Sequence, residues 1–373
     1  MKLSCGIIGL PNVGKSTLFN ALLKKQVAYA ANYPFATIEP NVGIVEVPDD
    51  RLAALATVFP NNPPLVPAVV EFYDIAGLVA GASKGEGLGN KFLSHIREVA
   101  AIVHVVRIFE DSTITHVSDK IDPASDIATI NTELILADLA TLEKYKKPKG
   151  NAAKEDLATF EVVKKLRAEL DAGTSAKDVD LDDDEKEAIK QLDLLSMKPV
   201  LFVFNTSESQ LEDKEGTEKK ITEILRSLPA GRHGAQNDKS SEYLYLCAKL
   251  ENDIVELSSE EQKEYLNQYG LQETGLNRLI QKTYDLLGLI SFLTAGEKEV
   301  RAWTIKKGSN AVQASGEIHT DFMKNFIKAE ISSFTDFVAL KGWAGAREKG
   351  KVTLAGKDYI MKDGDVVEFK IGV

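Results

Sequence analysis

The stretch Gly9–Thr17 reads GLPNVGKST and matches the phosphate-binding pattern G-x-x-x-x-G-K-[ST]. A strand-like apolar run, Leu3–Ile8, comes directly before it, and a helical pattern over Lys15–Leu23 begins inside it. In that setting the backbone N–H groups of the turn and the helix N-terminus attract phosphate oxygens. The stretch therefore predicts a P-loop that binds the phosphates of a nucleoside triphosphate.

The polar side chains of this loop are expected to bind different parts of the nucleotide and its metal ion. Lys15 is expected to reach the β- and γ-phosphates, which makes it a catalytic candidate as well, and Ser16 is expected to bind Mg²⁺. Nucleotide contacts are predicted for Asn12, Val13, Gly14, Lys15, Ser16 and Thr17.

A second motif, Asp74-Ile75-Ala76-Gly77, ends the strand-like run Ala68–Asp74. Downstream of a P-loop, Asp74 is expected to hold Mg²⁺ through water, and the Gly77 N–H to meet the γ-phosphate. Thr37, between the P-loop helix and the second strand, would complete the Mg²⁺ shell, or else is an ordinary loop threonine. The glycine-rich segment after Gly77 is expected to act as a switch loop.

The base-reading loop departs from the usual GTPase pattern. GTPases read guanine with N-K-x-D after a late strand, whereas here Phe204 is followed by Asn205-Thr206-Ser207-Glu208. The lysine is replaced and the aspartate is lengthened, so guanine loses its usual partners and ATP becomes possible. Cys247-Ala248-Lys249 after the next strand resembles the S-A-K loop that supports the base from the other side.

The remaining pattern indicates an α/β protein with a mostly parallel sheet, because short apolar strands alternate with helices. Between 126 and 196 apolar residues recur at helical spacing on both sides of a Lys146–Gly150 break, which predicts an inserted helical hairpin. From 297 the pattern is strand-like again and predicts a separate small domain. The expected strands of the first part are Val42–Val47, Ala101–Arg107, Pro199–Phe204 and Tyr243–Cys247.

Composition bounds the class of protein. With 373 residues, 44% apolar and 27% charged, the chain should form two to three packed domains. It has no apolar run of spanning length and no signal-peptide pattern, so we expect a cytoplasmic protein. Cys5 and Cys247 are expected to be buried reduced thiols.

Charge is distributed unevenly along the chain. The net charge of −11 argues against broad nucleic-acid binding, although residues 297–373 hold 13 Lys and Arg against 11 Asp and Glu. The last domain is therefore the better candidate for RNA contact.

Taken together, these motifs resemble the YchF subfamily of the Obg-related P-loop ATPases. The resemblance covers nearly the whole chain and rests on these segments: GLPNVGKST (9–17), NYPFATIEP (32–40), DIAGL (74–78), GEGLGNKFLSHIRE (85–98), NTSE (205–208) and the ending GKDYIMKDGDVVEFKIGV (356–373). Thr206-Ser207 differs from the residues expected inside the family's base motif.

The resemblance implies a GTPase-like P-loop fold in three parts. These would be a discontinuous nucleotide domain (1–125 and 197–290), an inserted helical coiled coil (126–196) and a ubiquitin-like TGS domain (297–373). It also implies ATP binding and hydrolysis in preference to GTP, with Asn205, Glu208, Cys247 and Ala248 around the base. Ribosomes, translation control and stress responses are the implied setting; a monomer is the default.

The catalytic apparatus is expected to be unusual. Many GTPases place a water-orienting Gln directly after D-x-x-G, and here that position is Leu78, so slow intrinsic turnover is expected. His95 is a candidate for orienting water, or else is a structural or surface histidine. Asn12 is a candidate K⁺ ligand, because in related enzymes an asparagine there helps to bind K⁺.

Two other functions stay open at this point. One is a GTPase assembly factor in which Asn205–Glu208 is a tolerated variant of N-K-x-D. The other is a nucleotide-gated scaffold in which binding to a protein or ribosome matters and hydrolysis hardly does.

Overall fold

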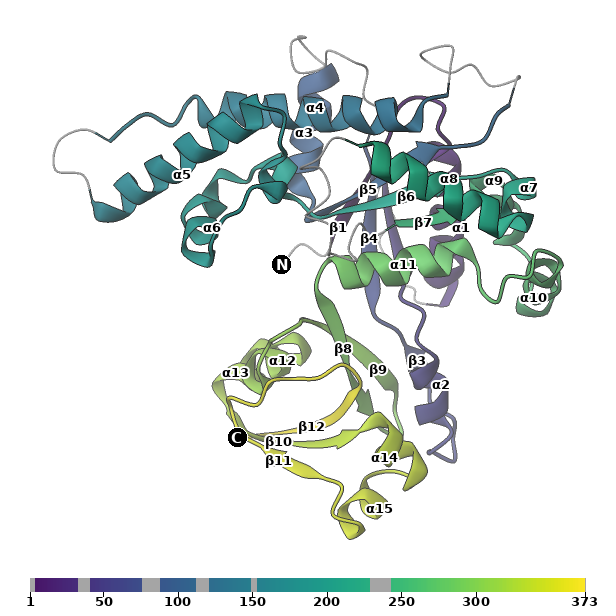
Figure 1. Ribbon diagram of the computed structural model, residues 1–373. Helices are drawn as coiled ribbons and strands as arrows, with labels where there is room; N and C mark the ends of the chain where they lie inside the picture. Colours follow the sequence, from purple (N-terminus) through teal and green to yellow (C-terminus); the bar gives the residue numbers. More distant parts are fainter. Residues whose placement is uncertain are drawn as a thin grey trace. The chain divides into compact units, whose positions relative to one another are not determined.

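A computed structural model of the protein describes residues 4–32, 41–75, 88–111, 121–148, 153–228 and 243–372. Its internal contacts divide the chain into two compact units. Unit 1 comprises Met1–Ile44 and Glu71–Leu279, and unit 2 comprises Val45–Val70 and Ile280–Val373. Each unit has its own sheet and its own core (Figure 1).

The sheet of unit 1 has the strand order β2-β4-β1-β5-β6-β7. β1 pairs in parallel with β4 and β5, β5 with β6, and β6 with β7, so the predicted mostly parallel sheet is confirmed. The strands are β1 (Ser4–Ile8), β2 (Val42–Glu46), β4 (Val69–Asp74), β5 (Ala101–Arg107), β6 (Val200–Asn205) and β7 (Tyr243–Leu246).

The centre of this sheet is buried on both faces. All seven residues of β5 are buried, as its unbroken apolar run predicts for a parallel strand covered by helices. His104 lies within it, fully buried with its ring 5.5 Å from that of Phe202, which confirms it as a core histidine. Burial lowers the pKa of His104 to about 3, and the charge of Lys177 adds to this, so the ring is neutral.

Helices connect these strands and place the loops. They are α1 (Lys15–Asn32), α3 (Leu88–Glu98), α7 (Glu208–Glu212), α8 (Lys214–Ser227), α9 (Ala248–Ile254), α10 (Ser259–Gln268) and α11 (Gly275–Leu286). Because the strands are parallel, the loops that follow β1, β5, β6 and β7 meet at one edge of the sheet.

The helical insert forms a satellite core of unit 1. α4 (Pro123–Leu142) and α5 (Lys154–Asp171) pack together, and α6 (Asp183–Ile189) packs on α5. Their shared cluster consists of Ile135, Leu142, Val162, Val163, Leu166, Leu170 and their neighbours. The periodic apolar residues of the sequence thus form two packed helices, as predicted.

The sheet of unit 2 has the order β11-β10-β12-β8-β9-β3 and mixes parallel with antiparallel pairs. Its strands are β3 (Leu65–Val66), β8 (Leu289–Ala295), β9 (Val300–Lys306), β10 (Phe326–Ser333), β11 (Thr353–Ala355) and β12 (Asp365–Ile371). Its helices are α2 (Asp50–Ala56), α12 (Ala311–Ile318), α13 (Thr320–Lys324), α14 (Phe334–Ala339) and α15 (Trp343–Glu348).

Residues 45–70 lie in unit 2, unlike the domain bounds predicted from the sequence. Those bounds placed the segment in the nucleotide domain and began the last domain at 297, whereas β3 pairs with β9 and β8 already starts at Leu289. The physical reason is burial: α2 covers Leu52, Leu55 and Ala56 by packing on β9 and α14. A local apolar pattern does not reveal which sheet will cover it.

Several smaller expectations concern single side chains. Cys5 and Cys247 are buried free thiols, as predicted, and burial raises the pKa of both. Trp303 stacks on Phe292 in the core of unit 2, and Trp343 packs edge-on against Phe337. Among the described helices, none is both long and apolar enough to cross a membrane.

Candidate nucleotide-binding site

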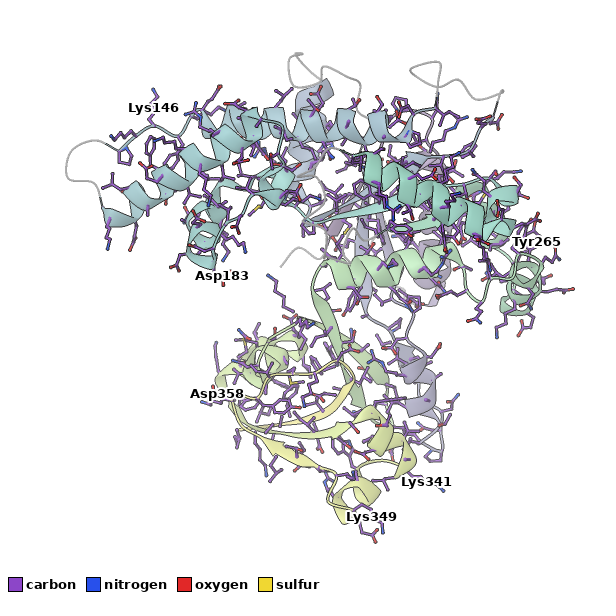
Figure 2. All side chains as sticks on the ribbon, in the orientation of Figure 1. Lys146, Asp183, Tyr265, Lys341, Lys349 and Asp358 are labelled. Atoms are coloured by element: carbon purple, nitrogen blue, oxygen red, sulfur yellow. The ribbon has the colours of Figure 1, made fainter. Side chains whose placement is uncertain are left out.

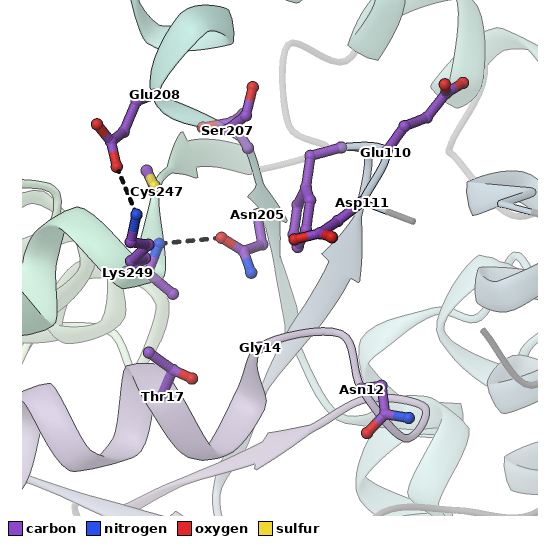
Figure 3. A pocket seen from close by; sticks show the side chains of 13 residues that line it. Asn12, Gly14, Thr17, Glu110, Asp111, Asn205, Ser207, Glu208, Cys247 and Lys249 are labelled. Carbon is purple, nitrogen blue, oxygen red and sulfur yellow. Dashed lines mark hydrogen bonds and ion pairs between the residues drawn. The ribbon is translucent and has the colours of Figure 1, made fainter. Parts of the chain in front are cut away.

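A cavity of about 490 Å³ opens in unit 1 beside the carboxyl ends of β5, β6 and β7. Its walls come from four segments: the P-loop, the residues after β5, the loop between β6 and α7, and the loop between β7 and α9 (Figure 3). The lining residues are Asn12, Gly14, Thr17, Phe109, Glu110, Asp111, Asn205, Thr206, Ser207, Glu208, Cys247, Ala248 and Lys249.

The P-loop backbone needs glycine at defined positions. Gly14 has φ +94°, and a Cβ there would lie 2.1 Å from Nδ2 of Asn205. A Cβ on Gly9 would lie 2.7 Å from the carbonyl oxygen of Val105. Asn12 also takes a left-handed φ of 63°, a conformation that asparagine tolerates better than most residues. The tight curl between β1 and α1 therefore requires glycine at both positions that the motif specifies, Gly9 and Gly14.

Asn205, at the end of β6, joins two walls of the cavity. Its Nδ2 donates to the carbonyl oxygen of Val13 at 2.9 Å, and its Oδ1 accepts the backbone N–H of Ala248 at 2.9 Å. Both bonds are buried, so the side chain braces the P-loop against the β7–α9 loop (Figure 3). One amide hydrogen of Asn205 is committed to Val13, which leaves the other for a ligand.

Glu208, the first residue of α7, already has partners for both carboxylate oxygens. Oε1 accepts from Nζ of Lys249 at 3.2 Å, and Oε2 accepts from the hydroxyl of Tyr269 at 3.2 Å. Figure 3 shows the Glu208–Lys249 contact at the cavity wall. In this arrangement the base end of the cavity presents a lysine ammonium next to an engaged carboxylate.

Lys15 and Asp74 form an ion pair at the phosphate end. Nζ of Lys15 donates to Oδ1 of Asp74 at 2.7 Å, and both side chains are largely buried. Asp74, the last residue of β4, thereby lies against the P-loop. Ser16 lies exposed in the first turn of α1, where its hydroxyl is available to a metal ion.

The structure therefore brings together most of the predicted site. Seven predicted base and phosphate residues line one cavity: Asn12, Gly14, Thr17, Asn205, Glu208, Cys247 and Ala248. His95 is exposed on α3 and does not belong to that lining. Thr37, Gly77 and Leu78 lie outside the described residues, so their roles stay predictions.

Sequence reasoning missed the wall that follows β5. Phe109, Glu110 and Asp111 line the cavity, and the buried Arg107 fixes them by donating to the carbonyl oxygens of Phe109 and Asp111. Its guanidinium also lies 4.5 Å from the centre of the Phe109 ring. The signal was available, because β5 is a buried parallel strand and ligands bind beyond the carboxyl ends of such strands.

Comparison with known proteins extends this picture over the whole chain. A family model described as "50S ribosome-binding GTPase" matches residues 4–136, and the YchF-GTPase_C model, described as "Protein of unknown function (DUF933)", matches residues 289–372. Two proteins named "Ribosome-binding ATPase YchF", from Bacillus subtilis (strain 168) and Escherichia coli O157:H7, are each 50% identical to this chain. Each match covers 100% of this chain and 100% of the relative.

The chain belongs to the YchF family. A solved structure titled "Structure of the Schizosaccharomyces pombe YchF GTPase" matches it with a TM-score of 0.86 and 36% identity, covering 99% of this chain and 98% of that one. The chain therefore has the P-loop NTPase fold.

Proposed function

We propose that the chain binds ATP in preference to GTP, hydrolyses it slowly, and uses the bound state to act on ribosomes. The observation that carries the base preference is the chemistry of the cavity wall. Reading guanine needs a carboxylate that faces N1–H and N2–H₂, and here the two oxygens of Glu208 are directed to the Lys249 ammonium and the Tyr269 hydroxyl. The relatives named ribosome-binding ATPases support the same assignment.

The backbone of Ala248 adds to this preference. A backbone donor in this loop is what a guanine O6 would require, and the Ala248 N–H is already bonded to Asn205. Adenine carries an amino group instead of O6, so it makes no demand on that donor. Phe109 supplies an apolar ring to the cavity, which suits either purine.

Mg²⁺ fits the phosphate end, because the Ser16 hydroxyl is a hard oxygen ligand of the kind that this ion prefers and the Asp74 carboxylate would hold the ion through water. Bound there with Thr37, it would neutralise charge on the phosphates. Lys15 would leave Asp74 for the phosphates when nucleotide binds. A K⁺ ion at Asn12 and a water-orienting role for His95 are further proposals.

The proposed slow turnover rests on the residue at position 78, and the proposed ribosome contact is assigned to unit 2 and the helical insert. Leu78 stands where many GTPases have the water-orienting Gln and has no group to orient water. Unit 2, proposed as the TGS domain, and the helical insert are the surfaces we assign to ribosome contact. We propose that the protein binds ribosomes and hydrolyses ATP in the cytoplasm, as a monomer.

Calorimetric titration with ATP and GTP in the presence of Mg²⁺ tests the base preference. We expect ATP to bind at least about tenfold more tightly, which is about 1.4 kcal/mol. Lys15→Ala should lose both nucleotides. Tighter GTP would instead favour a GTPase, the word that the solved relative's title uses.

Co-sedimentation with purified ribosomes tests the partner and separates a switch from a scaffold. For a switch, ribosome binding should differ between ATP and ADP, and ribosomes should change the rate of phosphate release. A scaffold would lose ribosome binding in Lys15→Ala but keep it in a variant that binds ATP without hydrolysing it.

A further inference from the structure

Tyr269 lies behind the cavity wall and reaches the base-reading carboxylate from a separate helix. It caps the C-terminus of α10 and donates its hydroxyl to Oε2 of Glu208 at 3.2 Å. It is not one of the residues that line the cavity. Its influence on a ligand therefore passes through Glu208.

The phenol is held by its own surroundings. Its backbone N–H donates to the carbonyl oxygen of Leu266 at 3.1 Å, and its ring lies 5.8 Å from that of Tyr265, which Figure 2 shows on α10. The ring also packs against the core cluster that contains Phe204. Burial, with the Tyr265 hydroxyl and the charge of Glu208, raises the pKa of Tyr269 to about 12, so the group stays a donor at neutral pH.

The two partners of Glu208 do not hold it equally. Lys249 has 76% of its side chain exposed, and ion pairs of that kind contribute little because water screens them. Tyr269 is half-buried and packed, so its hydrogen bond is the more restrictive contact. We therefore assign the orientation of Glu208 mainly to Tyr269.

This orientation matters for base choice. Guanine offers two neighbouring donors, N1–H and N2–H₂, and a carboxylate reads them by accepting one with each oxygen. For both oxygens to face these donors, Glu208 would have to turn from the orientation in which Tyr269 and Lys249 hold it. Adenine has an acceptor at N1, which suits the donor that Lys249 presents at the cavity wall.

We propose that Tyr269 is a positioning residue for base selection, which holds Glu208 away from the guanine-reading orientation. The proposal rests on the ATP preference proposed above and names the residue that enforces it. A residue outside N-x-x-E would then share control of specificity, and the loop alone would not determine the base.

The test compares Tyr269→Phe, Glu208→Gln and the double variant in the full-length protein. Calorimetry gives the affinity for ATP, GTP and inosine triphosphate, which lacks the N2 amino group. We expect Tyr269→Phe to lower the ATP-to-GTP affinity ratio by about tenfold through tighter GTP, the size of one hydrogen bond to a charged group. Inosine triphosphate should gain less, and Glu208→Gln in the double variant should abolish the gain.

Tyr243→Phe is the matched control. Tyr243 packs on Phe204 in the same cluster, with ring centres 6.1 Å apart, and its hydroxyl makes no contact with Glu208. It should leave the ratio within about threefold of wild type. A wild-type preference for ATP that Tyr269→Phe leaves intact would overturn the positioning role alone. Equal or tighter GTP binding by the wild type would overturn the proposed function itself.

Discussion

Asn205 connects the P-loop to the loop after β7 with one amide group. Replacing it with Asp keeps the acceptor for Ala248 but turns a carboxylate oxygen toward the carbonyl of Val13. We expect Asn205→Asp to lower the free energy of unfolding by about 2–4 kcal/mol, because the bond is buried and its replacement is repulsive. ATP affinity should fall by at least about tenfold.

Urea denaturation and calorimetry measure the two effects of Asn205→Asp. Asn267→Asp, on the exposed surface of α10, is the control that carries the same chemical change. If the two variants were equally stable, the hydrogen bonds that Asn205 makes to Val13 and Ala248 would contribute nothing to the free energy of unfolding.

His104 makes the fold acid-sensitive. Its pKa is about 3 when folded and about 6.5 when unfolded, so between these values only the unfolded chain binds the proton. Stability should therefore fall as pH drops below about 6.5, by about 2 kcal/mol at pH 5. His104→Phe should remove this part of the pH dependence in denaturation measured between pH 5 and 8, whereas His95→Gln, on an exposed face, should keep it.

At the scale of elements, one buried carboxylate joins α4 of the helical insert to the turn that precedes β6. Asp138 of α4 accepts from the backbone N–H groups of Leu195 and Ser196 and from the Ser196 hydroxyl, all within 2.7 Å. Burial raises the pKa of Asp138 although these bonds oppose the shift. The turn that it holds leads directly into β6.

Asp138→Ala should cost about 3–5 kcal/mol of unfolding free energy, since three donors lose their acceptor. Ser196→Ala removes two bonds, the one to Asp138 and the one that the Ser196 hydroxyl accepts from the backbone N–H of Ala176, and should cost about 1–3 kcal/mol. Urea denaturation measures both, with Thr132→Ala on the exposed side of α4 as the reference. Similar small losses in Asp138→Ala and Ser196→Ala would contradict an anchoring role.

The elements show what a sequence can and cannot reveal. The P-loop, β5 and Asn205–Glu208 were predictable because each depends on local spacing or an unbroken apolar run. Tyr269 was not, because it meets Glu208 only through tertiary packing across 61 residues. The Phe109 wall could have been predicted from the end of β5, but no motif marks it.

At the scale of the whole molecule, Arg51 ties unit 2 together across the sequence. It donates to both oxygens of Asp49 and to Oδ2 of Asp363, whose Oδ1 accepts the N–H of Ser291. The two carboxylates raise the pKa of Arg51 against the opposing effect of burial. The sequence alone could not assign α2 to this unit, because the second partner of Arg51, Asp363, lies near the opposite end of the chain.

Arg51→Met should destabilise unit 2 by about 1–3 kcal/mol, because bidentate charge-assisted bonds are lost. Hydrogen exchange should speed up in β8 and β9, while ATP affinity stays within about threefold. Lys349→Ala, which projects from the end of α15 (Figure 2), should change neither. If hydrogen exchange in β8 and β9 were unchanged in Arg51→Met, the bonds of Arg51 to Asp49 and Asp363 would not stabilise unit 2.

The placement of residues 45–70 in unit 2 also delays the packing of α2 during protein synthesis. This segment leaves the ribosome before β8 to β12 have been made, so α2 must wait with Leu52 and Leu55 uncovered. α2 ends at Ala56, and α14, which helps to cover it, ends at Ala339, 339 − 56 = 283 residues later. At about 5–20 residues per second the wait is roughly 14–57 seconds. For the same reason, a fragment confined to residues 289–372 would expose the face of β9 that α2 covers, and would be expected to aggregate when expressed alone.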